Sequence, residues 1–214
     1  MNKKEQKVIE GRINNFETIR KLLDFERSKD DFYFLQILQR KKDHGQSKVN
    51  GANNNSRLIK AYYIHSLDYF DFIKPEVIEI CNIFNARAGI NLNRRSYEQM
   101  AFHLLRKIAD QIMNKSFDKA YAAYNHVVGA YSQETDKKWI IDLDGDQDNF
   151  DMIFAIEEFI SEIQPNPGVS KTIARIPSKN GCHIIPSPFN LLDFKKRFPD
   201  IEVHKNNPTN LYIP

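Results

Sequence analysis

The sequence predicts a mixed α+β protein built from an N-terminal α/β half, residues 1–137, and a C-terminal half, residues 138–214. Short segments rich in β-branched and aromatic residues are typical of strands, and segments with apolar residues three or four positions apart are typical of helices. In the C-terminal half these segments follow the order β-α-β-β-α-β. That order predicts a split βαβ arrangement, in which two helices pack on one face of a four-stranded antiparallel sheet.

The composition of the whole chain is consistent with this class. With 214 residues, of which 41% are hydrophobic, the chain can bury a substantial core. No segment approaches the roughly 18 to 20 apolar residues of a membrane helix, and the charged N-terminus lacks the apolar stretch of a secretory signal. The two cysteines, Cys81 and Cys182, lie far apart and favour a reducing compartment. We therefore expect a cytoplasmic protein with no membrane partner.

The N-terminal half is expected to begin with a helix. Apolar residues recur every three or four positions between Val8 and Leu23. Aromatic and β-branched residues over 31–38 predict a strand, and 58–65 predicts the strand that returns beside it. The intervening residues 43–56 are dominated by Asn, Gly, Ser and charge, which is typical of a loop.

One strand and two helices follow in the sequence. Pro75 suits the first turn of a helix that continues to residue 85. Residues 87–93 alternate as a strand. Ser96 is predicted to cap the N-terminus of a helix over 97–113.

A further helix over 117–131 leads to the C-terminal half, where the pattern becomes regular. The strands expected there are 139–144, 172–176, 182–186 and a last region formed by 201–204 with 211–213. The helices expected there are 150–163 and 191–198.

Two carboxylates end the first strand of the C-terminal half. Residues 138–144 read as an apolar strand that finishes in Asp142-Leu143-Asp144. Side chains alternate along a strand, so Asp142 and Asp144 are expected on one face, where their oxygens suit a hard cation such as Mg²⁺ or Mn²⁺. The alternative is a strand end with solvated acids. An EF-hand is excluded, because Ile153 stands at the twelfth loop position, which requires Glu.

A polar turn introduces the third strand of this half, with the sequence Ser178-Lys179-Asn180-Gly181-Cys182-His183. A hydroxyl, a lysine and the backbone N–H groups of a glycine turn can bind phosphate, and a histidine at the strand start can donate to it. The alternative is an ordinary hairpin turn, for which Asn-Gly is the strongest short signal. The aspartates expected on a neighbouring strand favour the phosphate site.

In this order, the two motifs resemble the catalytic core of the archaeo-eukaryotic primase superfamily, which includes the primase-polymerases. Its members carry a strand ending in Asp-x-Asp or Asp-x-Glu, a Ser-x-His-type motif and a third acid on a later strand. These motifs lie on an RRM-like half that is joined to an N-terminal α/β half. Here the first motif matches closely, and the second has a longer spacing between Ser178 and His183. Glu202 stands where the family normally has Asp.

The resemblance implies a role for each motif residue. Asp142, Asp144 and His183 would be the catalytic residues. Asp142 and Asp144 would hold Mg²⁺ or Mn²⁺, with Glu202 completing the metal site. Ser178 and His183 would contact a nucleoside triphosphate. The resemblance covers residues 138–214 and is only general over residues 1–137.

Several basic residues could contact a nucleotide or a nucleic-acid backbone, and such contacts give affinity that is independent of sequence. Arg175 and Lys205 are the strongest of them because they fall on strands that flank the expected site, and Lys179 lies in the turn itself. The others are Arg40, Lys41, Lys42, Arg94, Arg95 and Lys171. The net charge of +3 permits a nucleic-acid partner without requiring one.

The resulting hypothesis is an enzyme, a metal-dependent nucleotidyltransferase of primase-polymerase type that synthesises or extends a strand on a template. Its partners would be nucleoside triphosphates and single-stranded or primed nucleic acid, with a replicative helicase as a further candidate. A minimal core of this kind suggests a phage or a mobile element, acting in the host cytoplasm. The alternative is a non-catalytic nucleic-acid-binding or replication-accessory module with a degenerate primase-like fold. A glycosyltransferase-type Asp-x-Asp site is disfavoured, because no nucleotide-sugar α/β layout precedes it.

Overall fold

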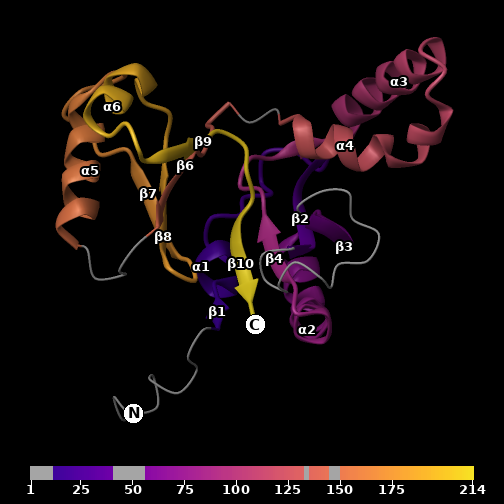
Figure 1. Cartoon of the computed structure of the whole chain (residues 1–214), viewed down its shortest axis with the longest axis horizontal. Coiled ribbons are helices and arrows are strands. Elements are labelled where there is room, and N and C mark those ends of the chain that lie inside the picture. Colours follow the sequence, from indigo (N-terminus) through magenta and orange to yellow (C-terminus); the bar gives the residue numbers. More distant parts are fainter. Residues whose placement is uncertain (1–11, 41–55, 133–134, 145–149) are drawn as a thin grey trace.

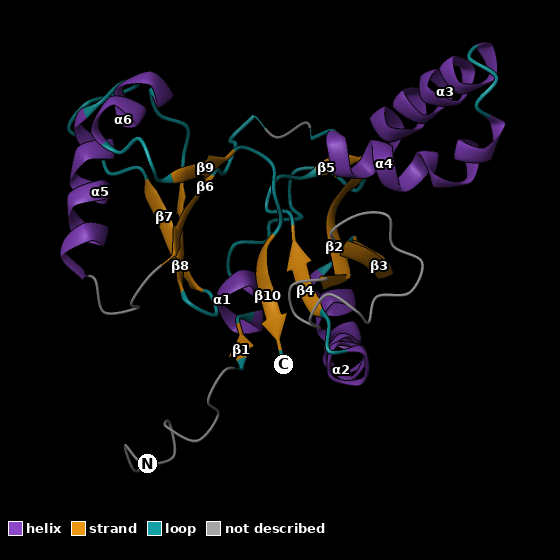
Figure 2. Ribbon diagram, viewed as in Figure 1, coloured by secondary structure: helices purple, strands orange, loops and turns teal. Residues whose placement is uncertain are grey.

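The computed structural model describes residues 12–40, 56–132, 135–144 and 150–214, with the backbone alone for Tyr121 and Asp144. The described residues form a mixed α+β structure, as the sequence predicts, and their strands form two antiparallel sheets (Figures 1 and 2). The predicted loop over 43–56 lies, except for Ser56, outside the described residues. The same holds for Val8, the start of the first predicted helix.

The first sheet contains the first five strands of the chain and also the last one. Its strands are β1 (Ile13–Asn14), β2 (Asp31–Arg40), β3 (Ser56–Ile64), β4 (Arg87–Ile90), β5 (Arg95–Ser96) and β10 (Thr209–Ile213). They lie in the order β1-β10-β4-β2-β3, and β5 pairs with β2. The chain therefore returns to the first sheet at its C-terminus.

Two sequence-based predictions are wrong at this point. Residues 211–213 do not extend the 201–204 strand region, because β10 pairs with β4 and its side chains are buried in the core of the first sheet. Residues 13 and 14 are not helical, because Ile13 pairs with Ile213. Helix α1 is accordingly short and spans Phe16–Arg20. In both cases the pairing joins segments that are more than a hundred residues apart in the chain, which no local pattern reports.

The second sheet contains β6 (Ile140–Asp144), β7 (Thr172–Pro177), β8 (Gly181–Pro186) and β9 (Glu202–His204). Its strands lie in the order β7-β8-β6-β9, and all neighbours are antiparallel. Helix α5 (Phe150–Glu162) connects β6 to β7, and α6 (Leu191–Arg197) connects β8 to β9. Both helices lie on the same side of this sheet (Figure 2).

The two faces of the second sheet have different partners. One face packs on α5 and α6 through a buried apolar cluster: Trp139, Ile141, Ile153, Ile156, Ile160, Ile184, Phe189 and Phe194. The other face contributes Ile140, Ile176 and Ile185 to the core of the first sheet. Because side chains alternate along β6, Ile141 points to the helices while Ile140 and Asp142 point to the first sheet. This alternation places the Asp142 side chain between the two sheets.

Helix α2 spans Leu67–Phe84 and begins eight residues before the predicted start at Pro75. The Ser66 side chain caps it by accepting a hydrogen bond from the Tyr69 N–H at 3.1 Å. Pro75 lies inside the helix and lacks the N–H that would bond to the carbonyl of residue 71. Buried side chains on both sides of Pro75, at Phe70 and Val77, keep the helix on the sheet across this position.

Helix α3 spans Tyr97–Met113, and Ser96 caps it as predicted, accepting from the Gln99 N–H at 3.2 Å. The predicted helix over 117–131 is divided into a 3₁₀ helix, η2 (Phe117–Ala122), and the α-helix α4 (Ala123–Ala130). Together α3, η2 and α4 form an arm at the far end of the molecule from α5 and α6 (Figure 1).

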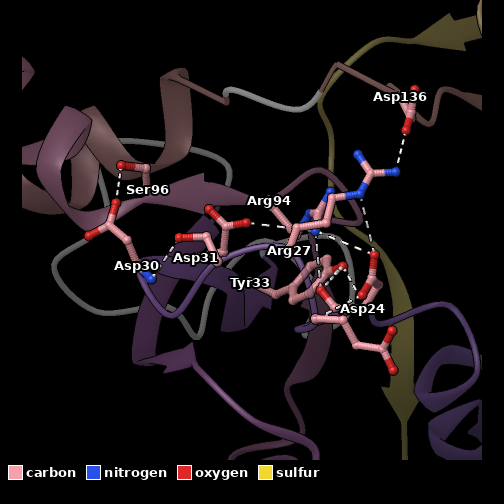
Figure 3. Close-up of polar contacts among 10 residues, drawn as sticks. Asp24, Arg27, Asp30, Asp31, Tyr33, Arg94, Ser96 and Asp136 are labelled. Atoms are coloured by element: carbon pink, nitrogen blue, oxygen red, sulfur yellow. Dashed lines mark hydrogen bonds and ion pairs between the residues drawn. The ribbon is translucent and has the colours of Figure 1, made fainter.

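A polar network ties the segment before β2 to the chain that leads into the second sheet (Figure 3). The buried Arg94 side chain places Nη1 3.5 Å from Asp24 Oδ2 and 3.6 Å from Asp31 Oδ2. Arg27 lies 3.6 Å from the same Asp24 carboxylate and also pairs with Asp136, just before β6.

A buried asparagine continues this connection. The Asn93 side chain accepts from the Lys138 N–H at 2.7 Å and donates to the Lys138 carbonyl at 2.9 Å. It also lies 3.2 Å from the carbonyl of Lys205, directly after β9. The connection between β4 and β5 therefore holds the residues that precede β6 and follow β9.

Candidate functional site

A cleft with a volume of about 1120 Å³ opens between the facing sides of the two sheets. The first sheet contributes the end of β2 and the starts of β4 and β10. The second sheet contributes β6, β8, β9 and the turn over 178–181. Of the polar residues that the sequence singles out, the following line the cleft: Asp142, His183, Glu202, Ser178, Lys179 and Arg40.

The registers of β6 place three of these residues in one row. Asp142 lies directly opposite His183 on β8 and directly opposite Glu202 on β9. Residues that oppose each other in an antiparallel pair project from the same face of the sheet. All three side chains line the cleft.

His183 is the buried member of this row, with 8% of its surface exposed. Its Nε2 lies 3.3 Å from Asp142 Oδ1. Its Nδ1 lies 2.9 Å from the Thr209 hydroxyl, and Nε2 is also 3.3 Å from the side-chain amide nitrogen of Asn210. The ring therefore spans from a carboxylate of the second sheet to the β10 strand of the first.

Glu202 is the exposed member of the row, with 72% of its side chain accessible. Its Oε2 lies 3.2 Å from Nε2 of His204, which also lines the cleft. His204 opposes Ile140 in the sheet and so shares a face with Glu202 and Asp142. Sequence reasoning missed His204, although the Glu-x-His spacing over 202–204 already predicts a shared face for the pair.

The predicted metal site is described only in part. Asp144 ends β6 opposite Gly181, and its side chain lies outside the described residues. Among the side chains that are described, no group of three or more His, Cys, Asp or Glu residues is close enough to hold one ion. The donors at the cleft, Asp142 and Glu202, offer carboxylate oxygens, which suit Mg²⁺ or Mn²⁺.

The turn between β7 and β8 is a hairpin, as the structural alternative predicted, and it also lines the cleft. The Ser178 N–H donates to the Gly181 carbonyl at 2.9 Å, so this N–H serves the turn. Ser178 is buried, whereas Lys179 and Asn180 at the tip are exposed. The group of this turn that suits a phosphate best is therefore the Lys179 ammonium.

Arg175 and Lys205 are not brought to the cleft. Arg175 opposes Ile184 on the helix-covered face of the sheet, where it pairs with Glu157 of α5. Its hydrogen bonds to that carboxylate raise the pKa of the guanidinium. The Lys205 ammonium lies 5.1 Å from the centre of the Trp139 ring. Neither residue lines the cleft.

The other basic residues fall into three groups: one lines the cleft, three are buried, and two lie outside the described residues. Arg40, at the end of β2, lines the cleft. Lys171 and Arg95 are buried: Lys171 donates to the carbonyls of Ser161 and Asn166, and burial lowers the pKa of Arg95 to about 10. Arg94 is buried in the network of Figure 3. Lys41 and Lys42 lie outside the described residues.

Arg87 is a cleft residue that sequence reasoning missed. It opposes Leu38 in the β2–β4 pair and lines the cleft together with Arg40. Nothing near it in the sequence marks Arg87 as functional, because the cleft forms only when β4 faces the second sheet. The cleft therefore has guanidinium groups on its first-sheet side and carboxylates on its second-sheet side, and this charge distribution suits a ligand that carries both phosphates and a divalent cation.

Within the described ranges, no helix is long and apolar enough to cross a membrane. Comparison of the chain with protein-family models, with curated proteins and with solved structures finds no significant match in any of the three.

Proposed function

We propose that this protein is a metal-dependent nucleotidyltransferase of primase-polymerase type, which synthesises or extends a nucleic-acid strand on a template. The observation that carries the proposal is the row of His183, Asp142 and Glu202 across the second sheet, facing Arg40 and Arg87 across the cleft. Carboxylates that can bind a metal ion and guanidinium groups that can bind a triphosphate therefore line the same cleft.

The topology of the second sheet supports the same proposal. Its elements follow the order β6-α5-β7-β8-α6-β9, and both helices cover one face. In the primase-polymerases, an RRM-like half joined to an N-terminal α/β half carries the metal-binding acids. Here Asp142 and Glu202 oppose each other in the second sheet and both line the cleft.

The chemistry assigns a task to each group. Asp142, with Asp144 and Glu202, would hold Mg²⁺ or Mn²⁺ through carboxylate oxygens. The bound metal would activate the attacking 3′-hydroxyl and stabilise the leaving pyrophosphate.

The basic side chains of the cleft would bind the nucleoside triphosphate. Arg40, Arg87 and Lys179 would neutralise the triphosphate through charge-assisted hydrogen bonds. His183 would donate to the phosphates from Nε2, the ring nitrogen beside Asp142. The 3′ oxygen would then bond to the α-phosphorus as the bond to pyrophosphate breaks, and the hydroxyl proton would pass to water.

The test is nucleotide incorporation by the purified protein on single-stranded and primed templates, with Mg²⁺ or Mn²⁺ and either ribo- or deoxyribonucleotides. Asp142→Asn keeps the shape of the side chain and removes its charge, so we expect incorporation to be lost. Asp118→Asn, in η2 on the helical arm, is the matched control and should retain it. Incorporation by Asp142→Asn at the wild-type rate would refute the proposal.

The second candidate function is a non-catalytic nucleic-acid-binding module. It is favoured by the long spacing between Ser178 and His183 and by Glu202 at the position where the primase family normally has Asp. Titration calorimetry with Mn²⁺ separates the two functions. Binding that disappears in Asp142→Asn supports the enzyme. Nucleic-acid binding without any Asp142-dependent metal binding supports the module.

A further inference from the structure

Thr209 joins the two sheets at the wall of the cleft. It is the first residue of β10, in the first sheet, and it is fully buried. Its hydroxyl lies 2.9 Å from Nδ1 of His183, in the second sheet. We propose that Thr209 is a positioning residue, which holds the His183 ring so that Nε2 faces Asp142 and the substrate. The role in substrate binding rests on the function proposed above.

The physical reason is that the buried ring needs a partner at each nitrogen. A buried nitrogen without a hydrogen bond costs about 1 to 3 kcal/mol. A hydroxyl can donate or accept, so Thr209 satisfies Nδ1 in either neutral tautomer and in the charged ring. A ring turned over would remove this bond and would move Nε2 away from Asp142. The Thr209 hydroxyl therefore selects one orientation of the ring.

Thr209 is itself held by close packing. It opposes Ile90 at the end of β4. A Cβ at the neighbouring Gly89 would lie 3.1 Å from Pro208 Cβ and 3.3 Å from the Thr209 carbonyl oxygen. A side chain at position 89 would therefore require Pro208 or the Thr209 carbonyl to move by a few tenths of an ångström. The hydroxyl is thus presented from a rigid strand, which a positioning role requires.

A buried asparagine fixes the neighbouring part of the site in the same way. The Asn15 side chain donates to the Asn210 carbonyl of β10 and to the Pro177 carbonyl of β7, both at 2.9 Å. Pro177 directly precedes the turn that carries Ser178 and Lys179. The first sheet therefore positions both the histidine and the turn.

The test uses three threonine variants. Thr209→Val keeps the shape and removes the hydroxyl, and Thr209→Ser keeps the hydroxyl. Thr172→Val is the matched control, because the Thr172 hydroxyl is buried without a hydrogen-bond partner. The first readout is the pair of ring-nitrogen NMR shifts of His183, and the second is KM against kcat for the nucleoside triphosphate.

We expect Thr209→Val to shift the His183 ring nitrogens and to raise KM about five- to tenfold, the equivalent of one hydrogen bond. Thr209→Ser and Thr172→Val should keep the wild-type ring shifts. A merely structural role of Thr209 would change the melting temperature and leave these shifts unchanged.

Identical His183 shifts in wild type and Thr209→Val would overturn the inference. If Thr209→Val does not fold, the wild-type spectrum decides, since a His183 Nδ1 without a hydrogen-bonded shift also overturns it. A wild-type protein that incorporates no nucleotide refutes the proposed function. In that case the ring-nitrogen shifts still decide whether Thr209 holds the ring.

Discussion

His183 Nε2 lies 3.3 Å from Asp142 Oδ1, although the two residues belong to motifs about forty positions apart in the sequence. Antiparallel pairing of β6 and β8 brings them together, because the register sets Asp142 opposite His183. The contact places an imidazole and a carboxylate at one wall of the cleft.

Glu202 is expected to be the third acid of the site. Glu202→Gln keeps the length of the side chain and removes its charge, so we expect metal-dependent incorporation to fall by about tenfold or more, with a rise in the Mn²⁺ dissociation constant. Glu158→Gln, an exposed change on α5, is the control and should leave both quantities unchanged. Wild-type Mn²⁺ affinity in Glu202→Gln would remove Glu202 from the site.

Arg40 and Arg87 are expected to bind the triphosphate. Loss of a guanidinium that hydrogen-bonds a phosphate typically costs about 1.5 to 3 kcal/mol, so Arg40→Ala and Arg87→Ala should each raise KM about ten- to a hundredfold. Arg57→Ala is the matched control, since Arg57 is exposed on β3 and does not line the cleft. Equal KM values for all three variants would show that these two residues do not contact the nucleotide.

Asn15 is expected to stabilise the contact between the sheets. Asn15→Ala removes two hydrogen bonds that the buried Asn15 side chain donates to the carbonyls of Pro177 and Asn210, so the free energy of unfolding should fall by about 1 to 3 kcal/mol. Urea denaturation measures this difference. Asn14→Ala, which removes one exposed acceptor at 3.3 Å from the Phe16 N–H, should cost under about 1 kcal/mol. A similar loss in both variants would contradict the assigned role of Asn15.

The buried thiol of Cys81 is expected to make the free energy of unfolding depend on pH in the alkaline range. Burial raises the pKa of this thiol from 9.0 to about 12. Above about pH 9 the unfolded chain releases the proton while the folded chain keeps it, so stability is lost as pH rises from about 9 towards 12. Burial raises the pKa values of Tyr62 and Tyr63 to about 12 as well, and they act in the same direction above about pH 10.

Cys81→Ala should flatten this dependence by up to about 1.4 kcal/mol per pH unit. Urea denaturation at about pH 8 and about pH 10.5 measures the slope. Cys182→Ala, which changes a less buried thiol, is the comparison. An equal slope in wild type and Cys81→Ala would show that Cys81 does not titrate differently in the two states.

The sequence alone determined the features that depend on local patterns. The strand that ends in Asp142-Leu143-Asp144, the cap at Ser96 and the hairpin at Asn180-Gly181 all come from residues close together in the chain. Capping and turn formation need only neighbouring backbone groups. To predict that Asp142, His183 and Glu202 share one face of a sheet, the neighbouring strands also had to be predicted correctly.

Only the tertiary structure decided which residues from distant segments meet. It placed β10 in the first sheet and so brought Thr209 to His183, and it turned Arg87 toward the cleft. It also turned Arg175 away from the cleft and onto Glu157. The physical reason is that pairing between distant strands depends on how buried faces fit together, and this information is spread over the whole chain.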